Sequence, residues 1–129
     1  MPRINILVLS IILALLQPVY DARITLPALT GSGSFGSSVT VLPNQNFVVT
    51  NLGFVDPVSG VLNVGAVFLF SPAGALISSL RGATLNETVG RKIIVLSNGN
   101  YLAASFSCGN LDQGAVTFCR TDAYFSTLG

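Results

Sequence analysis

Short apolar runs separated by clusters of Gly, Pro, Asn and Ser make up the chain from about residue 38 onward. The runs are rich in β-branched and aromatic side chains, which is the pattern of strands joined by turns. No segment of this part has the spacing of apolar positions that an amphipathic helix requires. We therefore predict an all-β chain. Its strands are expected at residues 38–42, 47–50, 66–70, 76–80, 92–96, 101–105, 115–118 and 123–126.

The predicted strands fall into two similar halves. The segment 36–50 returns 54 positions later as 90–104 with five of fifteen residues identical, and a second block, 65–70, is echoed by 114–119. Repeats of this length are typical of propellers, solenoids and arrays. We expect two tandem four-stranded antiparallel repeats resembling propeller blades. A β-sandwich and an open β-meander are the alternatives, and the tandem repeat disfavours the sandwich.

An N-terminal signal peptide is expected to precede the repeats. Arg3 is followed by an apolar run over residues 4–16, and a proline-containing break leads to a candidate cleavage site after Ala22. Tyr20 stands where such a site prefers a small residue, so an uncleaved signal anchor is the alternative. The organisation is then signal peptide 1–22, repeat unit 1 at 23–80 and repeat unit 2 at 81–129. Such a chain is secreted or held at the cell surface.

The connection between the second and third strands of each unit is the part that is freest to carry a binding surface. It spans residues 51–64 in unit 1 and 107–113 in unit 2. The candidate binding residues in these two loops are Asn51, Phe54, Asp56, Asn63, Asn110 and Asp112.

Two further features depend on export. Cys108 and Cys119 are the two cysteines of the chain, and an oxidising compartment permits a disulfide between them. In a tight hairpin Cys119 would lie further from the turn than Cys108 and would not face it directly, so two small buried residues are the alternative. Asn86 opens an Asn-Glu-Thr triplet and is a candidate N-glycosylation site, although Thr88 fits an ordinary turn equally well.

The sequence predicts neither catalysis nor a cofactor. It contains no histidine, the commonest general base, and none of its carboxylates after residue 22 recurs at the matching position of the other unit. The net charge is +1, and Arg91 and Lys92 form the only adjacent basic pair of the repeat region, whereas nucleic-acid binding needs a clustered basic face. We expect a non-enzymatic protein that binds no nucleic acid.

Several blocks resemble the FG-GAP repeat of integrin α-chain β-propellers. Phe35-Gly36 with its strand is similar to the opening of that repeat, Val89-Gly90 to a second opening, and the block 65–70 to its third strand. Unit 2 is also similar to uncharacterised bacterial extracellular repeat proteins, through the blocks 96–102 and 114–116.

The resemblance implies blade-like repeats and an extracellular adhesion role. Many members of the family bind Ca²⁺ in an Asp-rich loop between the first two strands. The corresponding turns here, 43–46 and 97–100, contain no carboxylate and are too short to surround an ion, so no metal ligand is transferred.

We therefore expect a secreted or cell-surface repeat module for binding or adhesion, whose partner is an extracellular protein or glycan. A structural repeat segment of an extracellular array is the alternative, and an enzyme fragment whose catalytic residues lie elsewhere is a third. Propellers close with 4–8 blades, so two units predict pairing with other blades of the same chain or self-association. The chain ends where a third unit would begin, which favours a truncated array.

Overall fold

A computed structural model of the chain describes residues 23–26, 29, 31, 33–106, 114–121 and 125–127, the last three by their backbone alone. The predicted signal peptide, residues 1–22, lies outside the described part, and so do Cys108, Asn110 and Asp112.

The described residues form eight β-strands and no helix. The strands are β1 (Phe35–Val41), β2 (Phe47–Asn51), β3 (Ala66–Phe70), β4 (Leu76–Arg81), β5 (Lys92–Val95), β6 (Tyr101–Ser105), β7 (Ala115–Cys119) and β8 (Phe125–Thr127). Each overlaps a predicted run, and most ends agree to within one residue. The all-β prediction is confirmed.

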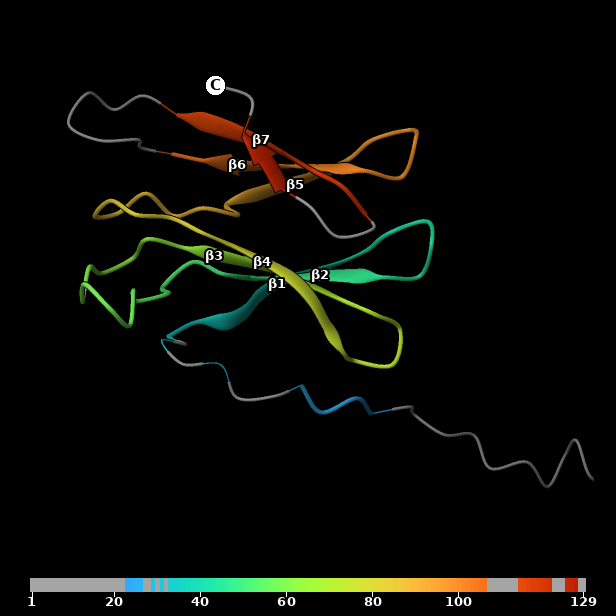
Figure 1. The fold of residues 1–129 in the computed structure, drawn as a ribbon, viewed down its shortest axis with the longest axis horizontal. Coiled ribbons are helices and arrows are strands. Elements are labelled where there is room, and N and C mark those ends of the chain that lie inside the picture. Colours follow the sequence, from blue (N-terminus) through green and yellow to red (C-terminus); the bar gives the residue numbers. More distant parts are fainter. Residues whose placement is uncertain are drawn as a thin grey trace, which may run out of the picture.

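The strands pair into two antiparallel sheets, each in chain order (Figure 1). Sheet 1 has the order β1-β2-β3-β4 and sheet 2 the order β5-β6-β7-β8. Every neighbouring pair is a hairpin, because each strand follows directly on the one beside it. The two predicted four-stranded repeats are therefore present as two separate sheets.

The first hairpin turn of each sheet has the same construction. In sheet 1 the N–H of Leu42 donates to Asn46 O at 2.8 Å, and Gln45 takes a positive φ of 74°. In sheet 2 the N–H of Leu96 donates to Asn100 O at 2.7 Å, and Gly99 takes a φ of 86°. Glycine adopts this left-handed conformation at little cost, whereas Gln45 is strained by it. The repeat thus extends to the conformation of single turn residues.

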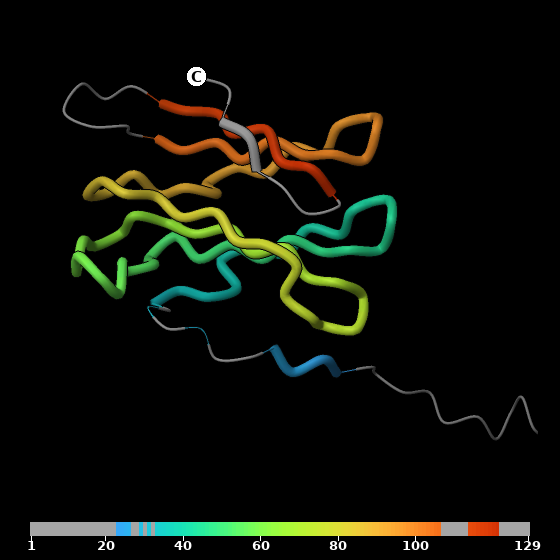
Figure 2. The backbone as a smooth tube through the Cα atoms, in the orientation of Figure 1, coloured from blue at the N-terminus to red at the C-terminus, as the bar shows by residue number. Residues whose placement is uncertain are grey.

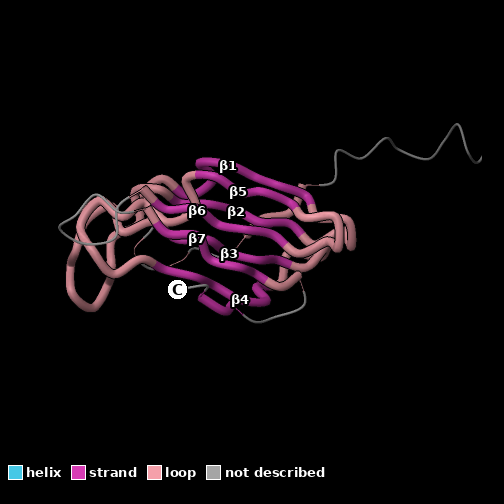
Figure 3. The backbone as a smooth tube through the Cα atoms, turned by 90° about the horizontal axis from the view of Figure 1, so that it is seen from above, coloured by secondary structure: helices cyan, strands magenta, loops and turns pink. Residues whose placement is uncertain are grey.

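The sheets stack face to face and share one hydrophobic core (Figures 1 and 2). The buried residues of this core are Leu42, Val48, Val67 and Leu69 from unit 1 and Val89, Tyr101, Ala103 and Cys119 from unit 2. Seen from above, the strands of the two sheets run in similar directions and follow one another in the same order (Figure 3).

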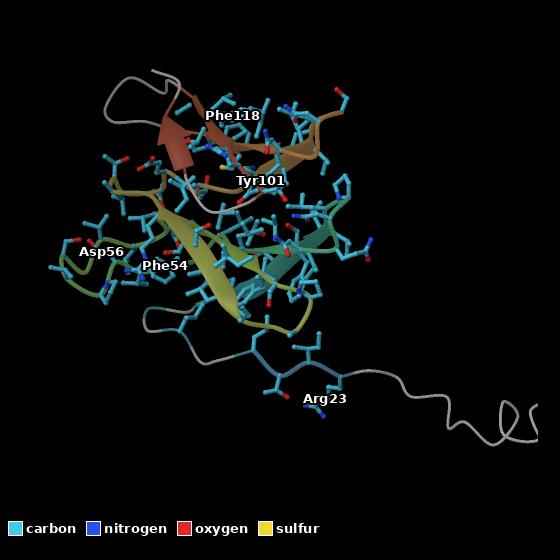
Figure 4. All side chains as sticks on the ribbon, turned by 45° about the vertical axis from the view of Figure 1, so that its right-hand side comes forward. Arg23, Phe54, Asp56, Tyr101 and Phe118 are labelled. Atoms are coloured by element: carbon cyan, nitrogen blue, oxygen red, sulfur yellow. The ribbon has the colours of Figure 1, made fainter. Side chains whose placement is uncertain are left out.

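The stacking is front to back. Val48 and Leu69 are cross-strand partners and face sheet 2, but the residues at the matching repeat positions, Leu102 and Phe118, lie on the face of sheet 2 that points away from sheet 1. Tyr101 lies on the inner face of sheet 2, and Figure 4 shows it between the sheets while Phe118 lies on the far side. Sheet 2 is therefore related to sheet 1 mainly by a shift along the stacking direction, so that matching faces of the two sheets point the same way.

A second core covers the outer face of sheet 1. Its buried members are Val49, Phe54, Val64, Ala66, Phe68 and Phe70. Leu26 and Leu29 of the N-terminal segment 23–33 pack against this core, and Ile24 contacts Gly74 in the β3–β4 turn. Sheet 1 is thus covered by sheet 2 on one face and by its own N-terminal segment on the other (Figure 2).

Candidate binding surface

Three connections gather at one end of the stacked sheets (Figure 1). They are the β2–β3 loop, the linker 82–91 between the sheets, and the start of the β6–β7 connection at Phe106. Backbone hydrogen bonds join them: the N–H of Asn86 donates to Leu62 O at 3.2 Å, and the N–H of Phe106 donates to Glu87 O at 3.1 Å. We call the exposed part of residues 55–63, 82–88 and 106 the loop surface.

The linker is held along the β2–β3 loop by a short parallel pairing. The N–H of Thr88 donates to Asn63 O at 3.1 Å, and the N–H of Val89 donates to Val64 O at 3.0 Å. The side-chain amide of Asn63 donates to Asn86 Oδ1 at 3.0 Å, and both asparagines have a left-handed φ, 52° and 58°. Asn63, a predicted binding residue, is therefore exposed but committed to holding the linker.

Glu87 stabilises the turn of the linker from within. Its Oε2 accepts hydrogen bonds from the N–H of Ala83 at 2.7 Å, the N–H of Thr84 at 3.0 Å and the hydroxyl of Thr84 at 3.1 Å. Hydrogen bonds to a charged acceptor are about twice as strong as those between neutral groups. The linker therefore has a fixed shape where it crosses from one sheet to the other.

The β2–β3 loop is itself a small hairpin. The N–H of Val64 donates to Phe54 O at 3.0 Å, and the N–H of Asp56 donates to Val61 O at 3.0 Å. The Asp56 carboxylate closes the tip by accepting from the Ser59 hydroxyl at 2.5 Å. This bond is the main reason that the pKa of Asp56 lies below its ordinary value, and Arg81 adds a smaller electrostatic contribution.

Asn51 and Phe54 do not belong to a binding surface, and the prediction was wrong for both. Each has no exposed surface. Phe54 packs edge-on against Phe68, with ring centroids 5.9 Å apart, and the Arg81 guanidinium lies 5.2 Å above its ring. Asn51 ends β2, and its Oδ1 accepts from the N–H of Ser34 at 2.9 Å. They anchor the loop to sheet 1, as Figure 4 shows for Phe54 beneath Asp56.

The exposed side chains of this end are different from those predicted. Val58 at the loop tip is 93% exposed, Leu62 54% and Leu85 60%. Phe106 is 59% exposed, and the Arg91 guanidinium lies 4.2 Å above its ring. The sequence signal for them was available, because each is a large apolar residue in a connection rather than in a strand.

A hollow of about 190 Å³ lies beside Phe106. Arg91 and Lys92 line it on one side, and Ala104, Ser105 and Phe106 on the other. It combines an apolar floor with two cationic side chains at the edge of sheet 2.

Cys119 is a free, buried thiol in the structure rather than half of the predicted disulfide. The β6–β7 register pairs it with Tyr101, at the end of the hairpin away from the connection that contains Cys108. Burial raises the pKa of the Cys119 thiol to about 12, so it is protonated and unreactive at neutral pH. Burial likewise raises the pKa of the neighbouring Tyr101. Cys108 itself lies outside the described residues.

The remaining predicted sites are placed as follows. Asn86 is exposed on the loop surface, where a glycan would reach solvent, while the hydroxyl of Thr88 in the same triplet is buried and has no hydrogen-bond partner. Asn110 and Asp112 lie outside the described residues.

Within the described part of the chain, no group of three His, Cys, Asp or Glu residues is placed to hold a metal ion. No helix there has the length and apolar character needed to cross a membrane. Comparison of the chain with protein-family models, with curated proteins and with solved structures gives no match.

Proposed function

We propose that the chain is a secreted or cell-surface repeat module of the β-propeller type that binds an extracellular protein or glycan through its loop surface and catalyses no reaction. Front-to-back stacking of two similar four-stranded sheets supports the comparison with propeller blades. The resemblance to FG-GAP repeats supports an adhesive role.

The observation that carries the proposal is the contrast between the two ends of the β2–β3 loop. Its base is fixed by the buried ring of Phe54, whereas its tip presents Val58 almost fully to solvent. A large apolar side chain on a loop that is already rigid can bind a partner with little loss of conformational entropy. Leu62 and Leu85 extend the apolar area beside it, since the linker is hydrogen-bonded along this loop.

The proposal is tested with point variants, because deleting the whole loop would remove the buried Phe54 as well. The labelled chain is applied to a printed glycan array and to immobilised extracellular-matrix proteins. We expect Val58→Ser combined with Leu85→Ser to lose at least tenfold in binding to whatever the native chain binds. Val39→Ser, a change at a 61% exposed position of sheet 1, serves as the matched control and should bind normally. Equal binding by all three chains, or none by the native chain, would contradict the proposal.

A structural role in an extracellular array is the second candidate. It is favoured by an apolar face of sheet 2 that nothing in the described part of the chain covers, where Ile94 and Val116 are 41% and 44% exposed. In that case the loop variants would change nothing, and assembly of the chain would be the property to measure.

A further inference from the structure

Sheet 2 has one apolar face that points away from sheet 1. Ile94, Leu102 and Phe118 lie in one row across β5, β6 and β7, and Lys92, Ala104 and Val116 lie in the next row. Side chains alternate between faces along a strand, so the five apolar residues of these rows lie together with Lys92 at their β5 margin, opposite Tyr101, Ala103 and Cys119. We call this set, Ile94, Leu102, Ala104, Val116 and Phe118, the open face.

Four of the five matching repeat positions are buried in unit 1, and the fifth, Thr40, is partly buried. The residues that match the open face are Thr40, Val48, Thr50, Val67 and Leu69. Val48, Val67 and Leu69 have no exposed surface because they lie against sheet 2. Within this chain, a face of this type is therefore covered by another four-stranded unit of the same repeat.

The centre of the open face is more apolar than its covered counterpart. Thr40 is replaced by Ile94 and Thr50 by Ala104, and three further positions keep large apolar side chains, whereas at the β5 margin Ser38 is replaced by Lys92. An antiparallel sheet with one solvated face normally alternates apolar and polar residues, with the polar ones facing water. Apart from Lys92 at its margin, the open face has the composition of an interior surface, which indicates a partner sheet.

The other end of the stack cannot provide that sheet. The centre of the outer face of sheet 1 is occupied by Leu26 and Leu29 of the N-terminal segment and by Phe54. Its margins, at Val39 and Val41 of β1 and at Leu76 of β4, are exposed. A second copy therefore cannot add head to tail without displacing that segment, whereas its own open face is free of cover by any described residue.

We propose that two copies of this chain pair through their open faces, related by a two-fold axis. A two-fold contact uses the same surface on both copies and closes at the dimer. Lys92 lies at the β5 margin of the open face, and a two-fold axis parallel to the strands and midway between the two sheets places its two copies at opposite edges of the contact, at least about 14 Å apart at three strand spacings. The contact is thus apolar at its centre, and this arrangement keeps the two copies of Lys92 apart.

This inference rests on how the sheets pack and is independent of binding by the loop surface. Sedimentation velocity and light scattering over a range of concentrations give the mass of the purified chain. The expected result is a concentration-dependent dimer. Val116→Lys and Leu102→Lys should give a monomer with an unchanged circular dichroism spectrum, and Val39→Lys, at the exposed margin of sheet 1, should remain dimeric.

A monomeric native chain at its highest soluble concentration would overturn the proposal, and so would a dimer that survives Val116→Lys. Growth into species larger than a dimer, or dissociation by Val39→Lys, would show head-to-tail addition instead. Should the lysine variants fail to fold, hydroxyl-radical footprinting of the native chain decides: oxidation of Phe118 should fall severalfold between dilute and concentrated samples. An unchanged yield would contradict the pairing.

Discussion

The two repeat units have the same strands and pairing, yet their burial differs sharply. All five residues of β3 are buried, whereas in β7, its counterpart, only Thr117 and Cys119 are. The difference comes from the neighbours, because sheet 1 lies between sheet 2 and the N-terminal segment while sheet 2 is covered on one face. The two similar sequences thus form two sheets of the same topology, and the position of each sheet in the stack decides how many of its residues are buried.

The outer faces of the two units show how a sheet end is closed. On sheet 1, Phe35 lies 5.7 Å from Phe68 and Phe47 lies 5.5 Å from Phe70, measured between ring centroids, so aromatic rings pack on one another. The matching residues of sheet 2, Tyr101, Thr117 and Cys119, lie on its inner face instead, because the sheets stack front to back, so they cannot close its outer face. Unit 1 closes its outer face with its own rings and the N-terminal segment, whereas no described residue packs over the centre of the outer face of unit 2.

The largest expected effect comes from truncating matched residues of the two units. Leu69→Ala should lower the free energy of unfolding by about 2–5 kcal/mol, because Leu69 is fully buried between the sheets. Phe118→Ala at the matching position should cost less in the monomer, because Phe118 is only partly buried. Urea denaturation at low protein concentration measures both. Equal losses would show that the open face is covered within a single chain.

The second comparison concerns two glycines at matching positions, Gly36 and Gly90, which have nearly the same φ of 88° and 90°. An alanine costs about 1–2 kcal/mol at either through the left-handed backbone alone. At Gly90 the added Cβ would also lie 2.6 Å from Val67 Cγ2, whereas at Gly36 it meets nothing within 4 Å. We expect Gly90→Ala to be the more destabilising by about 1–3 kcal/mol.

Thermal unfolding of both alanine variants, followed by circular dichroism, tests this difference. Gly36→Ala is the internal control, because it changes the same backbone conformation without the contact. Two variants of equal stability would mean that the linker can move away from sheet 1 at no cost.

The third prediction separates the two cysteines. With a pKa near 12, the Cys119 thiol should react with iodoacetamide at pH 8 about a thousandfold more slowly than an ordinary thiol of pKa 9, unless the protein unfolds. Mass spectrometry of the native and urea-unfolded chain counts the labelled sites. One additional label on unfolding is the expected result, and a native chain that gains labels only after reduction would instead establish the Cys108–Cys119 disulfide.

The strands and turns could be predicted because they depend on local pattern. Two short apolar runs and the Asn98-Gly99 turn between them determine β5 and β6 almost to the residue. The roles of Asn51 and Phe54 could not be predicted, because their burial depends on Ser34, Phe68 and Arg81, which are distant in the sequence.

The packing of the N-terminal segment on the outer face of sheet 1 could not be predicted from the sequence either. Leu26 and Leu29 are isolated leucines in a segment with no strand pattern, and only the packed structure shows that they lie on the second core. Front-to-back stacking is likewise a property of two sheets together, so a repeat in the sequence predicts similar units but not which face of each is buried.

The smallest expected effect is a change in the pKa of Asp56 at the tip of the β2–β3 loop. The tip is exposed, whereas the base of the loop is held by the buried Phe54. Asp56 should titrate below its ordinary pKa of 3.8, because the ionised carboxylate accepts the Ser59 hydroxyl and the N–H of Val58. A lowered pKa stabilises the fold above pH 3.8, and this stabilisation is lost as the pH falls through the Asp56 value. Since Asp56 lies in the small hairpin of the β2–β3 loop and outside both hydrophobic cores, the loss should change the fold little and be visible mainly in the loop.

Carboxyl chemical shifts followed by NMR between pH 2 and 6 give the midpoint. Ser59→Ala removes the largest cause of the shift and should return the Asp56 midpoint most of the way to 3.8, whereas Arg81→Gln should move it less, because the Arg81 contribution is the smallest. If Ser59→Ala left the midpoint unchanged, the tip would not hold the shape seen here. Val58 would then be presented on a mobile loop, and the contrast between a fixed base and an exposed tip would no longer support binding.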